Sequence, residues 1–253
     1  MVRKLEKHID KYGLIGKNIS YSFSKDFFNK KFKDEAIAFS KYENFDIQSI
    51  TEFPNILKEN PNIKGLNVTI PYKELIIPFL DKIDEEAKNI GAVNTIKISK
   101  KGKLKGYNTD CYGFKNSIKP NLKPHHEKAL ILGTGGASKA IAFALTKMNI
   151  SYAFVSRTSS NSAAYTYASL KEKDIENHQI IINCTPLGTY PKIMDCPKIP
   201  YQAISDKHIL FDLIYNPKET QFLKLGKVNN ATTMNGLDML IFQANKAWEV
   251  WNS

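Results

Sequence analysis

Two short segments each combine small hydrogen-bonding side chains with one ionisable group. Asn67–Lys73 ends in a lysine, and Asn108–Asp110 ends in an aspartate. A lysine beside an alcohol or carbonyl oxygen can give or take a proton, and a neighbouring carboxylate can orient that lysine. Lys73 and Asp110 are therefore candidates for a proton-transfer pair, although either residue alone would be typical of a solvated surface.

A third segment has the layout of a dinucleotide-binding turn. The apolar run Ala129–Leu132 leads into Gly133–Ser138, and a run of good helix formers follows. In such a strand–turn–helix unit, glycines let the backbone approach a pyrophosphate, and the first helical turn offers it unpaired N–H groups. Gly133 and Gly135 fit the G-x-G pattern, while Ser138 stands where a third glycine or alanine is usual.

The next predicted strand, Ser151–Val155, ends in Ser156, Arg157 and Thr158. Enzymes that use NAD normally have an acidic residue about 20 residues after the glycines, where it binds the ribose 2′-hydroxyl. This chain has an arginine there, one of only two arginines among its 36 basic residues. A guanidinium suits a 2′-phosphate by its charge and its forked donors, so the pattern predicts NADP.

Further segments complete an ordered set of motifs. They are Gly13–Gly16, Ser22–Ser24, Gly91–Thr95, Gly106–Asp110, Asn183–Gly188, Asp212–Pro217 and Asn235–Gln243. In their order and spacing, from about Tyr12 to Trp248, they resemble the shikimate dehydrogenase family. The resemblance implies an oxidoreductase that uses NADPH to reduce 3-dehydroshikimate reversibly to shikimate, in the shikimate pathway of aromatic amino acid biosynthesis.

The resemblance also implies roles for single residues. Lys73 and Asp110 would be catalytic. Substrate would be bound by Ser22, Ser24 and Tyr215 at its carboxylate and by Thr69, Asn94 and Gln243 at its ring hydroxyls. The cofactor would be bound by Gly133, Gly135, Gly136, Ala137, Ser138, Ser156, Arg157, Thr158 and Gly236. No metal ligand is implied.

Three positions depart from the family pattern. Tyr21 stands where histidine is frequent, Ser156 replaces the usual asparagine, and Ser159–Ser162 lacks a second arginine that is common there. The catalytic pair is intact. The last two departures concern how tightly the 2′-phosphate is held.

Composition limits the classes of protein. The chain has 253 residues, 42% of them hydrophobic, and no apolar run near the roughly 18 residues of a membrane span. Its three cysteines are too few and too irregular for a disulfide framework or a zinc site, and a reducing cytoplasm fits them. The net charge is +11, yet the lysines are spread along the chain and no nucleic-acid-binding signature is evident. We expect a cytoplasmic monomer or homodimer that binds neither nucleic acid nor membranes.

Alternating apolar strands and helical stretches predict an α/β fold with parallel sheets in two units. The expected strands are 13–16, 37–42, 64–68, 93–98, 104–107, 129–132, 151–155, 179–183 and 208–213. The expected helices include 25–33, 47–60, 72–80, the stretch after Asp110, and 236–251. A polar hairpin turn, Lys100–Lys103, precedes the strand 104–107, and a Pro-punctuated linker, Lys119–Pro124, precedes the glycine turn.

We therefore predict three parts: residues 1–109 as a substrate-binding α/β domain, 110–235 as an NADP-binding Rossmann-like domain, and 236–253 as a C-terminal helix that packs back on the first domain. The nearest alternative is an enzyme for quinate or an amino analogue, and the serine at Ser24 favours shikimate. A Rossmann-type protein without catalysis is a second alternative, against which Lys73 and Asp110 argue. A basic nucleic-acid module is the third.

Overall fold

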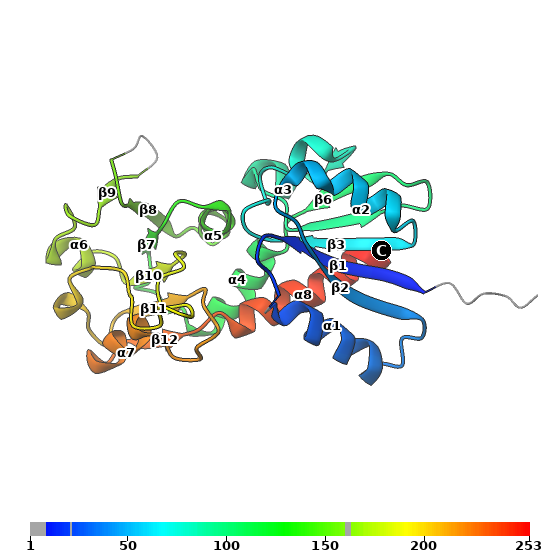
Figure 1. Ribbon diagram of the computed structural model, residues 1–253. Coiled ribbons are helices and arrows are strands. Elements are labelled where there is room, and N and C mark those ends of the chain that lie inside the picture. The colour runs from blue at the N-terminus through cyan, green and yellow to red at the C-terminus, as the bar shows by residue number, and fades with distance from the viewer. Residues whose placement is uncertain (1–8, 21, 160–162) are drawn as a thin grey trace, which may run out of the picture. The chain divides into compact units, whose positions relative to one another are not determined.

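The computed structural model describes residues 9–20, 22–159 and 163–253. The chain divides into two compact units. Unit 1 comprises Met1–Thr109 with Lys246–Ser253, and unit 2 comprises Asp110–Asn245. Tyr21 and Ser160–Ser162, two of the departures from the family pattern, lie outside the described residues, and the expectations about them stay predictions. Each unit is built on one six-stranded sheet with helices, so the predicted α/β fold class is confirmed (Figure 1).

Unit 1 contains sheet A, with strand order β2-β1-β3-β5-β6-β4. Its strands are β1 (Asp10–Gly16), β2 (Ser40–Asp46), β3 (Ile63–Val68), β4 (Lys82–Ile83), β5 (Thr95–Ile98) and β6 (Leu104–Tyr107). The prediction of a parallel sheet is wrong for β3/β5 and β5/β6, which are antiparallel, and the predicted hairpin turn at Lys100–Lys103 is confirmed by the β5/β6 pair. The turn between β5 and β6 is too short for a crossover connection. Gly102 in this turn has a left-handed backbone, with a φ of +74°.

The helical segments of unit 1 are α1 (Phe23–Asp34), η1 (Ile50–Glu52), α2 (Phe53–Glu59), η2 (Ile77–Phe79) and α3 (Glu85–Ile90). The predicted helix 72–80 is wrong: the segment forms turns that end in the short η2. Pro78 lies inside this segment, where it cannot donate a backbone hydrogen bond and disfavours helical geometry at Ile77. The strand predicted at 37–42 lies three residues later, as β2.

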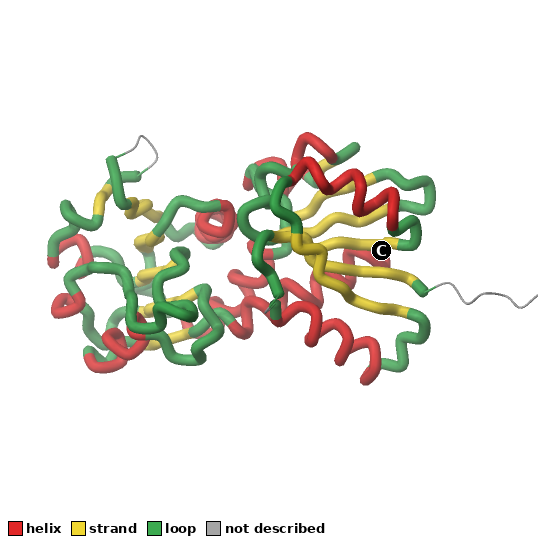
Figure 2. Tube along the Cα trace, viewed as in Figure 1, coloured by secondary structure: helices red, strands yellow, loops and turns green. Residues whose placement is uncertain are grey.

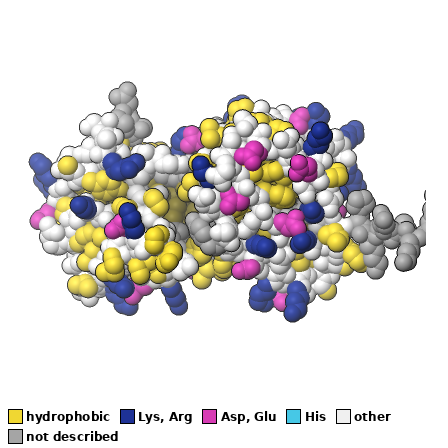
Figure 3. All heavy atoms as spheres, viewed as in Figure 1, with side chains coloured by type: hydrophobic (Ala, Val, Ile, Leu, Met, Phe, Trp, Pro, Cys, Tyr) yellow, Lys and Arg dark blue, Asp and Glu magenta, His cyan; other side chains and the backbone are white. Residues whose placement is uncertain are grey.

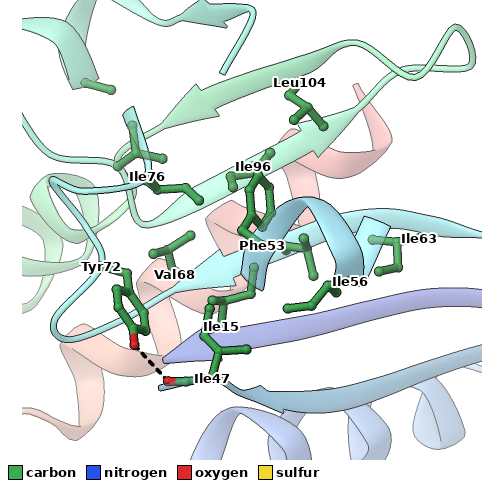
Figure 4. Close-up of a cluster of buried hydrophobic side chains, with 13 residues drawn as sticks. Ile15, Ile47, Phe53, Ile56, Ile63, Val68, Tyr72, Ile76, Ile96 and Leu104 are labelled. Carbon is green, nitrogen blue, oxygen red and sulfur yellow. Dashed lines mark hydrogen bonds between the residues drawn. The ribbon is translucent and has the colours of Figure 1, made fainter. Parts of the chain in front are cut away.

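Two apolar layers cover sheet A, since successive side chains of a strand point to opposite faces. On one face, Ile15, Phe53 and Ile96 belong to a buried cluster beneath α2 (Figure 4). On the other face, α1 and the end of α8 (Leu237–Asn252) pack through aromatic side chains (Figures 1 and 2). Trp251 donates from Nε1 to the Ile96 carbonyl at 3.0 Å and lies against Gly65, where any Cβ would come within 2.3 Å of its ring.

Unit 2 contains sheet B, which is parallel throughout with the order β12-β11-β10-β7-β8-β9. Its strands are β7 (Lys128–Leu132), β8 (Ser151–Ser156), β9 (Tyr165–Thr166), β10 (Ile180–Asn183), β11 (Ile209–Asp212) and β12 (Thr232–Met234). This is the strand order of dinucleotide-binding Rossmann domains. The strand order reverses between β7 and β10, and ligands bind beyond the carboxyl ends of the strands at such a point.

The helical segments of unit 2 are α4 (Asp110–Ile118), η3 (Lys119–Asn121), α5 (Gly136–Lys147), α6 (Glu172–Glu176), η4 (Tyr201–Ala203), α7 (Gln221–Val228) and the first part of α8. The central strands are apolar on both faces because helices cover both faces of a parallel sheet. All of Ile180–Asn183 and Ile209–Asp212 is buried. No helix among the described residues is long and apolar enough to span a membrane.

Candidate active site

The start of helix α1 brings Ser22 and Ser24 together. Ser22 is the N-cap, and its Oγ accepts a hydrogen bond from the Ser24 backbone N–H at 3.2 Å. Ser24 is almost buried, and its side chain is hydrogen-bonded to Tyr42. The first turn of a helix of this length presents N–H groups and a partial positive charge, which suit a carboxylate.

A chain of buried polar side chains runs inward from there. The Tyr42 hydroxyl donates to Asn67 Oδ1 at 2.8 Å, and Asn67 Nδ2 donates to Thr95 Oγ1 at 3.2 Å. Asn94 donates from Nδ2 to Thr109 Oγ1 at 3.0 Å and accepts from the Thr109 backbone N–H at 2.8 Å. These contacts fix the amide of Asn94 in one orientation, as the predicted contact with a ring hydroxyl would require.

Lys73 and Thr69 lie on the loop that follows β3, beside Asn94. The Lys73 carbonyl accepts from the Val93 backbone N–H at 2.7 Å, and the backbone N–H of Val68 donates to the Asn94 carbonyl at 2.8 Å. The loop is anchored by Tyr72, whose hydroxyl donates to the Ile47 carbonyl at 2.7 Å (Figure 4). The side chains of Lys73 and Thr69 are half-buried.

The structure thus gathers the proposed unit 1 residues at one end of sheet A. The carboxyl end of β3 carries Thr69 and Lys73, and the segment entering β5 carries Asn94. Ser24 joins the same group through Tyr42 and Asn67. The spacing in sequence gave no sign of this network, because its members come from separate strands.

In unit 2, Asp110 and Gln243 lie on two helices in close contact. Asp110 is the first residue of α4 and is 6% exposed, while Gln243 is 9% exposed on α8. Between them, Gly113 allows the close approach: a Cβ there would lie 2.5 Å from the Met239 carbonyl and 3.0 Å from the Gln243 Cβ. Lys73 and Asp110 belong to different units, and their pairing stays a prediction.

The glycine turn has the geometry expected of a pyrophosphate site. Gly133 has a φ of +103°, and Gly135 is the N-cap of α5 with open space where its Cβ would be. Gly136 and Ala137 then open a helix of 12 residues. Ser138 differs from the rest, because its side chain is fully buried and donates from Oγ to the Gly135 carbonyl at 2.6 Å. It can contribute a backbone N–H to a phosphate while its hydroxyl closes the turn.

The end of β8 lies beside the glycine turn, since β7 and β8 are paired neighbours and the Gly133 N–H donates to the Val155 carbonyl at 2.9 Å. Ser156 is nearly buried, and its hydroxyl donates to the Thr158 carbonyl. Arg157 and Thr158 are exposed. Glycines, a helix N-terminus and an exposed arginine fit the phosphates of NADP.

Two further candidates lie close to the carboxyl end of β11. Tyr215 follows β11 and is half-buried. Gly236 precedes α8 and donates its N–H to the Ile214 carbonyl at 3.0 Å. A Cβ at Gly236 would lie 2.1 Å from the Leu213 carbonyl, so the glycine is needed for this close approach. Among the described residues, no group of three His, Cys, Asp or Glu side chains could hold a metal ion.

Comparison with known proteins identifies the family. The model of the shikimate dehydrogenase substrate binding domain matches residues 14–96. A protein of Methanosphaera stadtmanae named shikimate dehydrogenase (NADP(+)) is 42% identical over 257 residues, covering 94% of this chain and 90% of that protein. The chain belongs to the shikimate dehydrogenase family. The resemblance seen in the sequence motifs is confirmed.

Solved structures of the shikimate dehydrogenase family agree with the fold. The enzyme of Aquifex aeolicus is 35% identical with a TM-score of 0.86, covering 100% of this chain and 94% of that chain. The enzyme of Thermus thermophilus, in complex with NADP(H) and shikimate, is 28% identical with a TM-score of 0.85, covering 96% and 93%. The two-domain fold of the family is therefore shared over nearly the whole chain.

Sequence reasoning missed residues that hold the candidate site together. They are Tyr42, Asn67, Thr95 and Thr109 in unit 1, and Asn183, Thr185, Asp212 and Thr220 in unit 2. Several lie inside motifs that were noticed, such as Asn183–Gly188 and Asp212–Pro217. Most of these hydrogen bonds join different elements and so leave no mark in local spacing, whereas the bond from Thr185 to Asn183 joins residues two apart.

Arg157 gives a direct test of cofactor preference. Arg157→Ala should weaken NADP⁺ binding roughly ten- to a hundredfold and hardly change NAD⁺ binding, because only NADP⁺ has the 2′-phosphate. The measurement is a titration of both cofactors at two ionic strengths. Higher salt should reproduce part of the loss in the unaltered protein, since exposed charges are screened over about 8–10 Å.

The matched control is Lys128→Ala, which removes an exposed positive charge at the amino end of β7. It should leave both affinities unchanged. Equal losses of NAD⁺ and NADP⁺ affinity in Arg157→Ala would mean that the arginine supports the fold or the pyrophosphate. A 2′-phosphate contact would then have to come from another residue, such as Lys171 or Lys173.

Proposed function

We propose that the chain catalyses the reversible NADPH-dependent reduction of 3-dehydroshikimate to shikimate. The observation that carries this proposal is the similarity to proteins named shikimate dehydrogenase (NADP(+)) over 94% of the chain. The polar side chains at the end of sheet A and the glycine turn of sheet B support it. The substrate and the cofactor are both anions, which suits a chain with a net charge of +11.

The division of labour follows the two units. Residues 1–109 form the proposed substrate-binding domain, 110–235 the NADP-binding domain, and 236–253 the C-terminal helix that returns to the first domain. This assignment is supported by the C-terminal residues of that helix, Lys246–Ser253, which belong to compact unit 1. The substrate carboxylate would lie at the N-terminus of α1, bound by Ser22 and Ser24 with help from Tyr215. Thr69, Asn94 and Gln243 would bind the ring hydroxyls.

The proposed cofactor site is the carboxyl edge of sheet B. Backbone N–H groups from Gly133 to Ser138 would bind the pyrophosphate, and Ser156, Arg157 and Thr158 would surround the 2′-phosphate. Gly236, which has no side chain, would leave space for the bound cofactor. When bound, NADPH supplies the hydride that no side chain can provide.

The proton is the part of the reaction that the protein must manage. As hydride reaches the carbonyl carbon, negative charge develops on the oxygen. Lys73, as an ammonium group, stabilises that charge and delivers a proton to the oxygen, and Asp110 orients the lysine. In the direction of shikimate oxidation, the same lysine accepts the hydroxyl proton.

One assay tests this function. Purified protein is mixed with NADP⁺ or NAD⁺ and with shikimate or quinate in all four combinations, and absorbance of the reduced cofactor is followed. The proposal predicts the fastest turnover with shikimate and NADP⁺. Turnover of quinate at a similar rate would favour the broader quinate/shikimate specificity, and no turnover with any pair would favour a binding protein without catalysis.

We also propose a cytoplasmic monomer or homodimer that does not bind nucleic acid. The three cysteines are free thiols, which suits a reducing compartment. On the face drawn in Figure 3, lysine and arginine side chains are scattered instead of forming one basic patch. Light scattering in solution would test the oligomeric state.

A further inference from the structure

Asp212 is a buried carboxylate that the proposed chemistry does not use. It is the last residue of β11 and is fully inaccessible to solvent. Its Oδ1 accepts from Asn183 Nδ2 and from the Ile214 backbone N–H, both at 3.0 Å, and its Oδ2 accepts from Thr220 Oγ1 at 2.6 Å. All three partners act as donors, so the contacts match the ionised form of the carboxyl group.

One arm of this network reaches the glycine turn. Asn183, held by Asp212, accepts at its Oδ1 from the Thr185 backbone N–H at 3.0 Å and from Thr185 Oγ1 at 2.7 Å. Thr185 in turn lies against Gly133, where an added Cβ would come 3.1 Å from the Thr185 Cγ2. Gly133 follows β7 directly and Asn183 ends β10, the two neighbouring strands at which the strand order of sheet B reverses.

The other arm holds the loop that carries Tyr215. Asp212 fixes the Ile214 N–H at the start of this loop and Thr220 at its end. The Ile214 carbonyl accepts from Gly236 at 3.0 Å, so the entry to α8 is tied to the same loop. A single carboxylate therefore sets the backbone on both sides of the edge where the cofactor is proposed to bind.

The buried Asp212 carboxylate lowers the stability of the folded protein when it is ionised. Burial raises the pKa of Asp212 from 3.8 to about 6, although its three hydrogen bonds lower it. Because the pKa is higher in the folded protein than in the unfolded chain, protonation stabilises the fold. This stabilisation is complete below about pH 4 and is lost as the pH rises through about 6. At neutral pH the charge is buried at a cost, and such groups concentrate at functional sites.

We infer that Asp212 is a positioning residue for the nicotinamide cofactor, which holds Thr185 against the glycine turn through Asn183. The inference rests on the proposed NADP site. It predicts that losing the carboxylate damages cofactor binding in a way that loss of stability alone does not. Asp212 touches neither cofactor nor substrate in this assignment.

The test compares Asp212→Asn and Asp212→Ala with a control, Gly226→Ala. Gly226 lies on α7, and a Cβ there would come 2.4 Å from Leu210 of the same strand, β11. The control should lower the melting temperature and leave cofactor affinity unchanged. Asp212→Ala should weaken NADP⁺ binding, measured by calorimetry, roughly tenfold or more, and Asp212→Asn by a smaller factor. Asp212→Asn should be no less stable than the unaltered protein above pH 6.

A double-variant cycle tests the route. Thr185→Val keeps the methyl group against Gly133 and removes the hydroxyl that binds Asn183. If Asp212 acts through Thr185, each single change weakens NADP⁺ binding, and Thr185→Val with Asp212→Ala is no weaker than the weaker single variant. Fully additive losses would overturn the route.

The pH dependence of NAD⁺ binding adds a second readout. NAD⁺ is chosen because it lacks the 2′-phosphate, which itself titrates near pH 6. Cys184 after β10 and Tyr201 of η4 are the titratable groups that interact with Asp212, and burial raises the pKa of both, so neither ionises in this range. Affinity should fall as the pH drops through about 6 in the unaltered protein and stay flat in Asp212→Asn.

The outcomes are distinguishable. If the unaltered protein binds neither cofactor, the proposed function fails. If it binds NADP⁺ and oxidises shikimate, but both Asp212 variants bind NADP⁺ as tightly as Gly226→Ala does, the role of Asp212 is purely structural and the inference is overturned.

Discussion

Replacing Lys73 with alanine should lower kcat by at least about 10²-fold, with a smaller change in the KM for shikimate. The change removes the proposed proton donor and a positive charge beside the developing alkoxide. The backbone of Lys73 is held by Val93, so the loop should keep its conformation when the side chain is shortened. Steady-state kinetics in both directions, with NADP⁺ affinity measured separately, would check this.

Lys103→Ala is the matched control for Lys73. Lys103 lies in the same unit, is largely exposed and pairs with Asp81 at 2.7 Å, so its removal changes the net charge equally. It should leave kcat unchanged. Near-normal turnover of Lys73→Ala would end its assignment as the proton donor, and an equal loss in both variants would point to long-range electrostatics.

Asp110→Asn should reduce both turnover and shikimate affinity, because it keeps the shape of the side chain but removes the carboxylate proposed to orient Lys73. We expect a loss in kcat/KM of at least about 10²-fold. In combination with Lys73→Ala, the loss should be little greater than that of the worse single variant, since the two residues are proposed to act as one unit. The measurement is kcat/KM for the two single variants and the double variant.

The control for Asp110 must account for its place at the start of a helix, where a negative charge is favourable. Asp238 is an exposed acid in the first turn of α8, so Asp238→Asn loses a comparable interaction without touching the proposed site. It should have normal kinetics. Multiplicative losses in the Lys73–Asp110 cycle would mean that the two residues act independently.

The sequence predicted unit 2 better than unit 1, and the reason is physical. The β7–turn–α5–β8 unit is specified locally, by an apolar run, glycines and a run of helix formers. In unit 1, whether two neighbouring strands are parallel or antiparallel depended on the length of the connection between them. The hairpin turn 100–103 was predicted and matches the antiparallel β5/β6 pair, but the antiparallel pairing of β3 with β5 was not predicted.

The candidate site shows the same limit. The sequence could predict Lys73, Asp110 and Arg157, because each is an ionisable residue within a short motif of characteristic neighbours. The side chains that hold them could not, since contacts such as Tyr42 with Asn67 or Asp212 with Thr220 join positions on different elements. Ser138 was predicted to bind cofactor, and only its inward-facing hydroxyl revealed a second task in closing the turn.

The contact of Trp251 with Gly65 and Ile96 has a consequence for how the protein is made. Unit 1 includes the C-terminal segment Lys246–Ser253, and the ribosome adds this segment only after it has made all of unit 2. Unit 2 is continuous in the chain and can fold as it emerges. The face of sheet A that Trp251 covers lacks this cover until the end of α8 has been made, so Tyr12 and Phe28 are without their ring contacts to Trp251 during synthesis.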